Sequence, residues 1–346
     1  MDVLAWFWIV TGTLIAVMLT VDFVGHVRTP HAPTLKEAGI WSAVYVAIAL
    51  VFGVAILLAW DTTHGVAYFS GYLLEKSLSI DNLFVFLLIM GSFRVPREYQ
   101  QKVLLIGIII ALVMRTVFIL LGNAVVENFS WIFWIFGAFL LYTAWAQARH
   151  KADQDEEYKE NGFVRLIRRI FPTTEDYVGD KMVVKQSGRR MITPMLIVMI
   201  AIGSADLLFA VDSIPAIFGV TTQLSGGEQI FIIFAANAFS LLGLRQLFFL
   251  IDGLLDRLVY LNYGLAAILG FIGVKLVIHA MHTNELSWLN NGEHIEIIPE
   301  VPTVLSLVVI VVVLTVTAWA SLTIGKRRHP QESPSPTIPV DPRGTK

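Results

Sequence analysis

Cysteine is absent from the 346 residues of this sequence, which excludes thiolate metal ligation, thiol redox chemistry and disulfide bonds for them. Charge is also scarce: charged residues make up 15% of the chain and hydrophobic residues 56%, with a mean hydropathy of +0.69. This balance lies far from that of a soluble domain. It predicts an all-α, polytopic membrane protein whose constant partner is the lipid bilayer.

Motifs for nucleotide-driven work are missing as well. The sequence contains no phosphate-binding loop and no segment resembling a soluble ATPase domain. We therefore expect no energy from nucleotide hydrolysis, no permanently bound cofactor and no nucleic-acid partner. The sequence leaves the oligomeric state open.

Nine apolar runs are each about long enough to cross a bilayer core of roughly 30 Å as a helix. The first starts after Asp2 and is followed by no small-residue cleavage site, so we expect an uncleaved span rather than a signal peptide. The runs are Val3–Val24, Trp41–Trp60, Val66–Met90, Val103–Gly122, Trp131–Ala148, Ile192–Val220, Ile230–Ile251, Val259–Ala280 and Val304–Ile324.

Basic residues occur only in alternate connections between these runs. The loops at 61–64, 123–128, 221–228 and 281–302 contain no lysine or arginine, whereas the loop from Arg149 to Arg190 contains ten. Lysine and arginine concentrate in the cytoplasmic loops of membrane proteins. We therefore expect a multi-pass protein of the cell membrane, with its N-terminus outside and its C-terminus in the cytoplasm.

The long basic loop mixes both charge signs, so it is predicted to be a solvated connector with one short amphipathic helix at Phe163–Phe171. The predicted organisation is two N-terminal helices over 1–64, a first three-helix repeat over 65–148, this cytoplasmic loop over 149–191, a second three-helix repeat over 192–281, an outer loop and last helix over 282–325, and a disordered tail over 326–346.

Two pairs of acids inside apolar runs give the strongest sign of an internal repeat. Glu75 and Asp81 are six residues apart, as are Asp206 and Asp212. Each second acid is followed directly by a small polar residue, and these residues are Asn82 and Ser213. The spans that carry the two pairs are expected to run in opposite directions, which predicts inverted repeats of three helices each.

The rest of each block supports the same alignment. Arg115 and Arg245 follow the second acids by 34 and 33 residues, and each has a phenylalanine three residues later. Glycine-led segments beginning at Gly137 and Gly270 come next in both blocks.

Helical geometry separates the two acids of each pair, because residues six apart on a regular helix point about 240° away from each other. Pro215 lies three residues after Asp212 and cannot donate a helix hydrogen bond. We therefore expect the second helix to unwind near Asp212, which would let both acids face one site. In the first repeat, Ser77 and Ser79 could loosen a turn by bonding backbone carbonyls.

Carboxylates inside a membrane are costly and are usually retained for an ion or a partner. The set here is rich in oxygen, with neither thiolate nor a histidine at depth, which suits hard divalent cations such as manganese, magnesium or calcium. For Asn237, a role as ligand or gate and a plain hydrogen bond between helices are equally favoured. The candidate metal ligands are Glu75, Asp81, Asn82, Asp206, Asp212, Ser213 and Asn237.

Four basic residues in the spans offer a structural explanation for the acids. Buried ion pairs are weak stabilisers, so four of them are poorly explained by stability alone. For Arg245, close to a cytoplasmic end, a side chain that reaches the membrane surface is an adequate explanation. The candidate charge-balancing residues are Lys76, Arg115, Arg245 and Lys275.

Three segments carry a resemblance to a known family: LEKSLSIDNLFVF, DLLFAVDSIPAIFGVT and NAFSLLGLRQLFFLI. They resemble signature blocks of the TerC/Alx family of integral membrane proteins, named for tellurium resistance. The resemblance implies export of manganese from the cytoplasm, with Glu75, Asp81, Asp206 and Asp212 as ligands. Tellurite resistance is an associated phenotype. One departure is Gly203, where some members carry a glutamate.

The hypothesis from the sequence is a secondary transporter, not an enzyme, that exports divalent cations by alternating access around a mid-membrane carboxylate site. A counter-transported proton or another ion gradient would supply the energy. One rival is a non-transporting scaffold for tellurite or metal stress resistance that recruits partners through the charged loop. The other is an intramembrane enzyme with paired carboxylates, for which no nucleophile is evident.

Overall fold

The computed structural model describes most of the chain and leaves several connections aside. The described residues are 3–27, 34–129, 131–149, 164–165, 169–174, 176–186, 189–251, 260–284, 289–290, 293–295 and 298–324. The predicted tail and four residues of the predicted helix at Phe163–Phe171, namely 163 and 166–168, lie outside them. Within these residues the fold is all-α except for one short hairpin, as the composition predicted.

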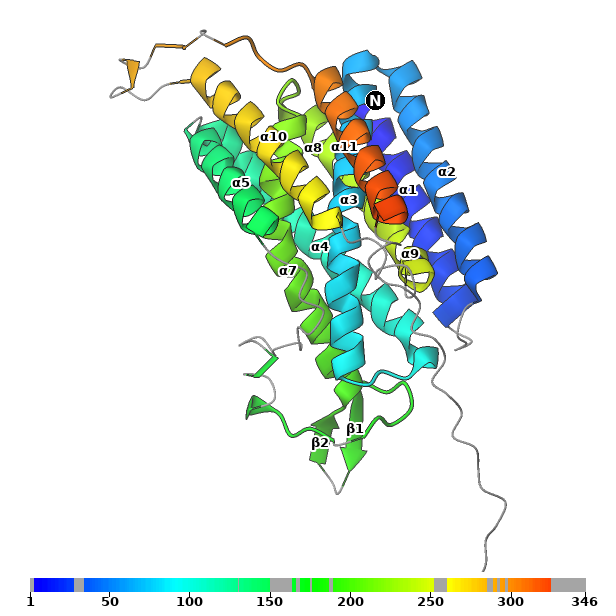
Figure 1. The fold of residues 1–346 in the computed structure, drawn as a ribbon. Helices are drawn as coiled ribbons and strands as arrows, with labels where there is room; N and C mark the ends of the chain where they lie inside the picture. Colours follow the sequence, from blue (N-terminus) through cyan, green and yellow to red (C-terminus); the bar gives the residue numbers. More distant parts are fainter. Residues whose placement is uncertain are drawn as a thin grey trace, which may run out of the picture.

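The helices form one bundle with a β-hairpin at one end (Figure 1). Their bounds are α1 Val3–Asp22, followed by the π-helix η1 Phe23–Val27, α2 Leu35–Ala59, α3 Thr62–Ser92, α4 Arg97–Asn128, α5 Ile132–Arg149, α7 Pro194–Val220, α8 Gly226–Leu242, α9 Leu244–Ile251, α10 Leu261–His282 and α11 Thr303–Ile324. The hairpin pairs β1 Val183–Gln186 with β2 Arg189–Ile192. We call its side of the bundle the hairpin end.

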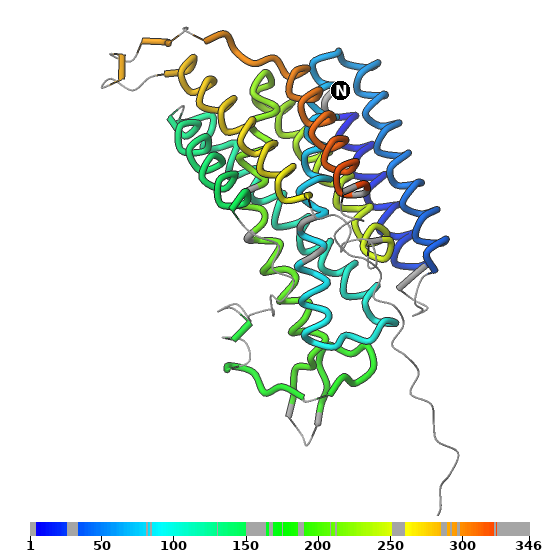
Figure 2. The backbone as a smooth tube through the Cα atoms, viewed as in Figure 1, coloured from blue at the N-terminus to red at the C-terminus, as the bar shows by residue number. Residues whose placement is uncertain are grey.

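Three helices are longer than a bilayer requires. α3, α4 and α7 have 31, 32 and 27 residues, whereas about 20 residues cross the hydrocarbon core. The lower parts of α3 and α7 extend past α5, α10 and α11 toward the hairpin (Figure 2). The bundle therefore has a wide half and a narrower half at the hairpin end, each with its own cluster of buried apolar side chains.

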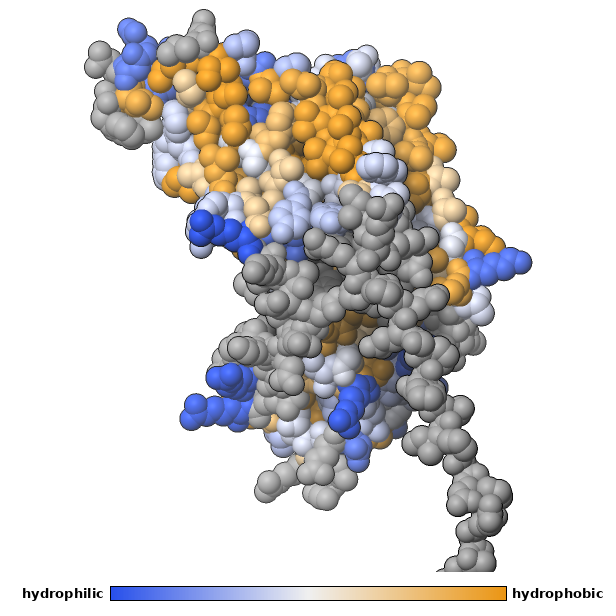
Figure 3. Space-filling model, in the orientation of Figure 1, coloured by the Kyte–Doolittle hydropathy of each residue, from blue (hydrophilic) through white to orange (hydrophobic). Residues whose placement is uncertain are grey.

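Seven segments of the described chain are long and apolar enough to span a membrane. Apolar side chains cover much of the wide half on the face drawn in Figure 3. α3 and α5 are not among the seven, although both pack inside the bundle with the others. The chain is thus a multi-pass membrane protein, and the count of nine spans stays a prediction. The seven are Ala5–Gly25, Leu35–Ala59, Arg97–Asn128, Pro194–Val211, Gly226–Leu250, Leu261–His282 and Thr303–Ser321.

The third helices of the two predicted repeats, α5 and α10, make a close antiparallel contact. A Cβ added at Gly137 would lie 3.1 Å from the Gly273 carbonyl oxygen, and one at Gly273 would lie 3.2 Å from the Gly137 carbonyl oxygen. Farther along, Ala144 packs opposite Gly270. Small residues let the two backbones approach, as is usual between membrane helices.

The first and second helices pair across the predicted repeats. α3 runs parallel to α8, since His64, Gly71 and Lys76 contact Glu228, Ala236 and Ser240 in that order. α4 likewise runs parallel to α7, since Gly107, Arg115 and Gly122 contact Ile202, Asp206 and Phe218 in that order. Each first helix thus packs along the second helix of the other block.

The helix breaks do not lie where the sequence predicted them. α3 is continuous through Asp81, and α7 is continuous through Pro215, so the expected unwinding near the acids is wrong. A ring that lacks an N–H can stay in a helix where neighbouring helices hold the backbone in place. The break lies instead at Gly243, which divides the predicted span Ile230–Ile251 into α8 and α9.

The charged loop contains the hairpin, which the sequence analysis did not predict, and this part of the loop docks on the ends of the long helices. Tyr177 donates from its hydroxyl to the Phe93 carbonyl at 2.9 Å, and burial raises the pKa of that tyrosine to about 12. Lys102 on α4 pairs with Asp180 at 2.6 Å, which lowers the pKa of Asp180. Most of the described loop residues are nevertheless exposed, so this part of the loop is solvated and anchored to the bundle by these two contacts.

Replacing Gly137 by alanine tests the close contact between α5 and α10. The new Cβ would lie 2.7 Å from Val277 Cγ2 and 3.1 Å from the backbone nitrogen of Val277. We expect a loss of about 1–3 kcal/mol in the free energy of unfolding, measured by denaturant unfolding in detergent micelles. Gly12→Ala on α1 is the control, because an added Cβ there has no neighbour within 4 Å. Equal effects of both substitutions would contradict the close approach.

Asp61 caps α3 and gives a pH-dependent test. Its Oδ1 accepts the His64 backbone N–H at 2.9 Å, and this bond, with a second from the His64 ring, lowers the pKa of Asp61. The stabilisation is therefore present above the unfolded pKa of about 3.9 and lost as pH falls through the lower folded value. Asp61→Ala should cost about 1 kcal/mol of unfolding free energy at pH 7 and progressively less below about pH 4.

Thermal unfolding of Asp61→Ala and Thr62→Ala across that pH range makes the measurement. Thr62 is the first residue of α3 and is also exposed. A pH-independent loss, or the same loss in both variants, would show that the carboxylate does not act as a cap.

Candidate functional site: a buried arginine between two carboxylates

One arginine joins an acid from each predicted repeat. Arg115 on α4 donates from Nη1 to Glu75 Oε2 on α3. Its Nε lies 3.4 Å from Asp206 Oδ2 on α7, and its Nη2 lies 3.5 Å from Asp206 Oδ1. The exposed fractions are 1% for Arg115, 0% for Glu75 and 3% for Asp206, so the three charges are shielded from solvent.

Local packing explains why Arg115 reaches both acids. A Cβ added at Gly107 would lie 2.8 Å from Ile202, and one at Gly122 would lie 3.0 Å from Phe218. These glycines flank Arg115 along α4, so α4 and α7 approach closely on both sides of it. Gly71 plays the same part where α3 meets α7 and α8.

The charges in this group do not cancel. With all three groups ionised, two carboxylates and one guanidinium carry a formal charge of −1. Glu75 Oε1 is also buried with no hydrogen-bond partner. A buried acceptor without a partner is unfavourable, and buried charge is costly unless it is fully paired. The group therefore carries negative charge that a further cation would balance.

A small cavity adjoins this group on the hairpin-end side. Asp206 forms part of its wall, and the remaining wall residues come from α3, α4, α8 and α9. Its empty volume is about 240 Å³ including its opening, with free space for about one water-sized group. The other lining residues are Asn82, Phe86, Gly107, Ile108, Ala111, Leu241 and Leu244.

Several predicted ligands are buried with oxygens that no group satisfies. Ser213 Oγ and Asn237 Oδ1 have no hydrogen-bond partner, and neither do Ser77 Oγ and Ser79 Oγ on α3. The interhelical hydrogen bond that was one explanation for Asn237 is therefore not made by its carbonyl oxygen. Polar atoms that are buried without a protein partner are uncommon, and these oxygens are free of protein donors to accept from a ligand or water.

The second acids are described only as backbone. Asp81 and Asp212 lie within continuous α3 and α7, but their side chains are outside the described part of the structure. Among the described residues no group of three or more acidic or histidine side chains could hold a metal ion. Oxygen donors from Glu75, Asp206 and Asn82 could contribute part of a site.

Among the described side chains, the other three predicted charge-balancing residues pair with neither Glu75 nor Asp206. Lys76 donates to the Ser240 carbonyl at 3.2 Å, next to the break at Gly243, where a Cβ would lie 3.0 Å from its Nζ. An ammonium at the end of a helix is favoured by the helix dipole. Lys275 is 1% exposed and donates to Ser306 Oγ on α11 at 3.1 Å.

Arg245 forms a separate buried ion pair. Its Nη2 lies 2.6 Å from Asp22 Oδ1 on α1, and Gln246 Nε2 donates to the same oxygen at 3.2 Å. Arg245 is only 2% exposed, so the explanation that its side chain reaches the membrane surface is wrong. Sequence analysis missed Asp22, although an acid close to the end of the first apolar run was the available signal.

Gly203 lies on α7, three residues before Asp206. A Cβ at this position would be 3.2 Å from Ile110 Cγ2 on α4, so the space between α7 and α4 at Gly203 is tight.

Comparisons with known proteins agree with this architecture. The model of the integral membrane protein TerC family matches residues 60–329. The chain is 50% identical over 317 residues to an uncharacterized membrane protein of Mycobacterium tuberculosis, covering 91% of this chain and 78% of that protein. It is 39% identical over 277 residues to the Escherichia coli protein Alx, covering 77% and 84%, whose name describes a candidate membrane-bound redox modulator.

An uncharacterized membrane protein of Myxococcus xanthus is 39% identical over 261 residues, with 75% of this chain and 80% of that protein covered. No solved structure matches. The chain belongs to the integral membrane protein TerC family. The resemblance noted in three sequence segments is confirmed.

Removing Arg115 tests the central ion pairs. Arg115→Gln would leave Glu75 and Asp206 buried without their cation, so we expect a loss of about 3–5 kcal/mol in unfolding free energy. Denaturant unfolding in detergent, with divalent ions chelated, makes the measurement. Arg149→Gln is the control, because Arg149 is exposed and lies 4.1 Å from the Trp145 ring centroid, a contact worth about 1 kcal/mol or less. Similar small losses in both variants would contradict the assigned ion pairs.

Proposed function

We propose that this protein is a secondary transporter that exports a divalent metal cation, with manganese as the preferred cargo, from the cytoplasm. The observation that carries the proposal is the convergence of Glu75 and Asp206 on Arg115 inside the bundle. Acidic side chains inside membrane spans line ion pathways more often than they stabilise the fold. Membership of the TerC family supports a membrane role but does not itself name a cargo.

The cargo site in this proposal is formed at the junction of the two predicted repeats. Glu75 and Asp206 are the described carboxylate ligands, and Asp81 and Asp212 are proposed to join them when the cation is bound. Asn82, Ser213 and Asn237 would complete or gate the site with neutral oxygens. Such a set suits manganese, magnesium or calcium better than zinc or copper.

Arg115 takes the place of the cargo when the site is empty. A guanidinium is always charged, so it neutralises part of the acidic charge without any ion from solution. The empty site can then change its orientation without an uncompensated pair of carboxylates. Lys76, Lys275 and Arg245 balance charge elsewhere in the bundle, and entry of a proton could offset the remaining charge and supply energy.

Orientation follows from the distribution of basic residues. The hairpin end carries Lys102, Lys185 and Arg190, while the opposite end has Asp61 and Glu228 around His64. We therefore place the hairpin end in the cytoplasm and the N-terminus outside. None of the relatives described above carries the name of an enzyme, in keeping with a transporter.

A scaffold that recruits partners is the second candidate, favoured by the exposed hairpin. Lys185 and Arg190 lie opposite each other in its register and are both exposed. Deleting residues 183–192 and joining the ends would abolish a scaffold's phenotype while leaving metal flux measurable. The redox role in the name of Alx could not rest on thiols of this chain, which has no cysteine.

Flux in proteoliposomes tests the transport proposal. Glu75→Gln and Asp206→Asn keep side-chain size but remove the charge, so each should lower manganese flux by about 100-fold or more, the effect of losing roughly 3 kcal/mol of ion stabilisation. Glu127→Gln is the matched control, because that carboxylate is exposed at the far end of α4. Normal flux in both buried variants would exclude the acids from the mechanism.

A further inference from the structure

The two equivalent arginines of the predicted repeats have different partners. Arg115 lies between Glu75 and Asp206, whereas Arg245 is held by Asp22 on α1, outside both repeats. Arg115 contacts the first acid of its own repeat, Glu75, and the first acid of the other repeat, Asp206. In a symmetric arrangement Arg245 would make the same two kinds of contact, and therefore contact the same two acids. The structure is therefore asymmetric at its most charged position.

We infer that this is one of two states in which the arginines exchange places. In the other state Arg245 leaves Asp22 and lies between Glu75 and Asp206, while Arg115 is released from them. Asp22 holds Arg245 away from the acids and so sets the balance between the states. The role of this exchange in transport rests on the proposed function, whereas the exchange of the two arginines itself requires no particular cargo.

The same correspondence identifies a second cavity. Asn82 and Phe86 line the hairpin-end cavity and follow Glu75 by 7 and 11 residues. The residues that follow Asp206 by 7 and 11 residues, and so correspond to them in the second repeat, are Ser213 and Ile217. Gly107 also lines it, eight residues before Arg115, and the residue eight before Arg245 is Asn237. Its counterpart in the other state would open toward the opposite end of the bundle, lined by Ser213, Ile217 and Asn237.

Unsatisfied oxygens support this assignment independently of the repeat. Ser213 and Asn237 are 1% and 2% exposed, and Ser213 Oγ and Asn237 Oδ1 lack hydrogen-bond partners. Polar atoms buried without partners cost free energy that water or a hydrated cation would recover. Their burial here is explained if the present state closes a path that the other state hydrates.

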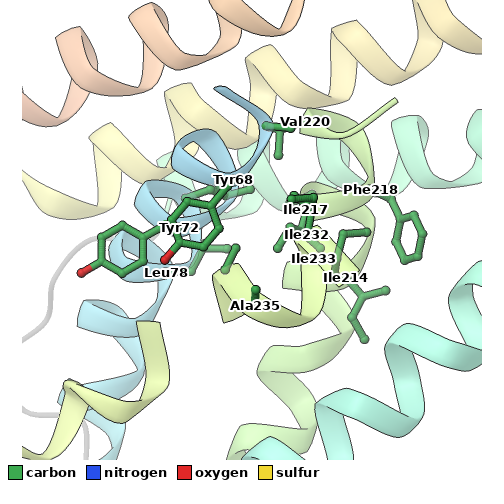
Figure 4. Close-up of a cluster of buried hydrophobic side chains, with 14 of the residues drawn as sticks. Tyr68, Tyr72, Leu78, Ile214, Ile217, Phe218, Val220, Ile232, Ile233 and Ala235 are labelled. Carbon is green, nitrogen blue, oxygen red and sulfur yellow. The ribbon is translucent and has the colours of Figure 1, made fainter. Parts of the chain in front are cut away.

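Packing closes that path in the present state. Figure 4 shows Ile217 beside Ile232 and Ile233 in a cluster of buried apolar side chains that also includes Tyr68 and Phe218. Ile217 is 1% exposed. The hairpin side of the acids has a cavity, while the described side chains around Ile217 on the opposite side are buried and packed, as expected for one half of an alternating cycle.

Single-cysteine labelling tests the exchange, and the absence of natural cysteines makes it direct. Ile217→Cys would be placed in lipid nanodiscs and labelled with a membrane-impermeant maleimide. We expect slow labelling in the otherwise unchanged chain. Adding Asp22→Asn, which leaves Arg245 without its carboxylate, should speed labelling by about tenfold or more, because a buried charge that loses its partner strongly shifts the equilibrium.

Two further variants separate exchange from loosening of the fold. Ala216→Cys is the matched reporter, because Ala216 is 0% exposed and its counterpart Val85 does not line the described cavity. Its labelling should not change. Adding Arg245→Gln to Asp22→Asn removes the competing guanidinium and should return labelling at position 217 to the slow rate.

If Asp22→Asn does not fold, Gln246→Met provides the test, because it removes only the amide bond to Asp22. It should accelerate labelling at position 217 in the same direction but less. Unchanged labelling at 217, or equal acceleration at 216, overturns the exchange. The labelling experiment needs no metal. If labelling follows the expected pattern but the protein carries no manganese in the flux assay, the proposed cargo is wrong and the exchange stands.

Discussion

The guanidinium of Arg115 between two buried carboxylates is the interaction on which the rest of the structure depends. It ties α3, α4 and α7 together at a depth where water is excluded and charge is costly. Because the pairing leaves one net negative charge, it holds the helices together without fully satisfying the acids. The proposed transport site would need this kind of incomplete neutralisation in order to bind a cation and release it again.

The helix contacts give one close antiparallel pair and two parallel pairs. α5 and α10 meet backbone to backbone through Gly137 and Gly273. α3 with α8 and α4 with α7 form two parallel pairs, each drawn from both predicted repeats. The helix break at Gly243 separates α9, which carries Arg245, from α8. Lys76 lies at this break and donates to the Ser240 carbonyl.

Composition and basic-loop spacing were enough to predict a helical membrane protein, and the family followed from three segments. The pairing of Glu75 with Arg115 was within reach, because both residue types are rare in apolar runs. Sequence alone could not predict that Asp22 would hold Arg245, since that contact depends on how α1 packs against distant helices. The continuity of α7 through Pro215 was mispredicted for a similar reason, because tertiary packing outweighed a local propensity.

The central claim is that Arg115 and the metal cation compete for the same two carboxylates. Titration calorimetry of manganese into the purified, metal-free protein and into Arg115→Gln, with Arg149→Gln as control, tests it most directly. The account predicts that Arg115→Gln binds manganese at least about tenfold more tightly, a change of roughly 1.4 kcal/mol, because the tethered cation no longer competes. Unchanged or weaker binding in Arg115→Gln would contradict it.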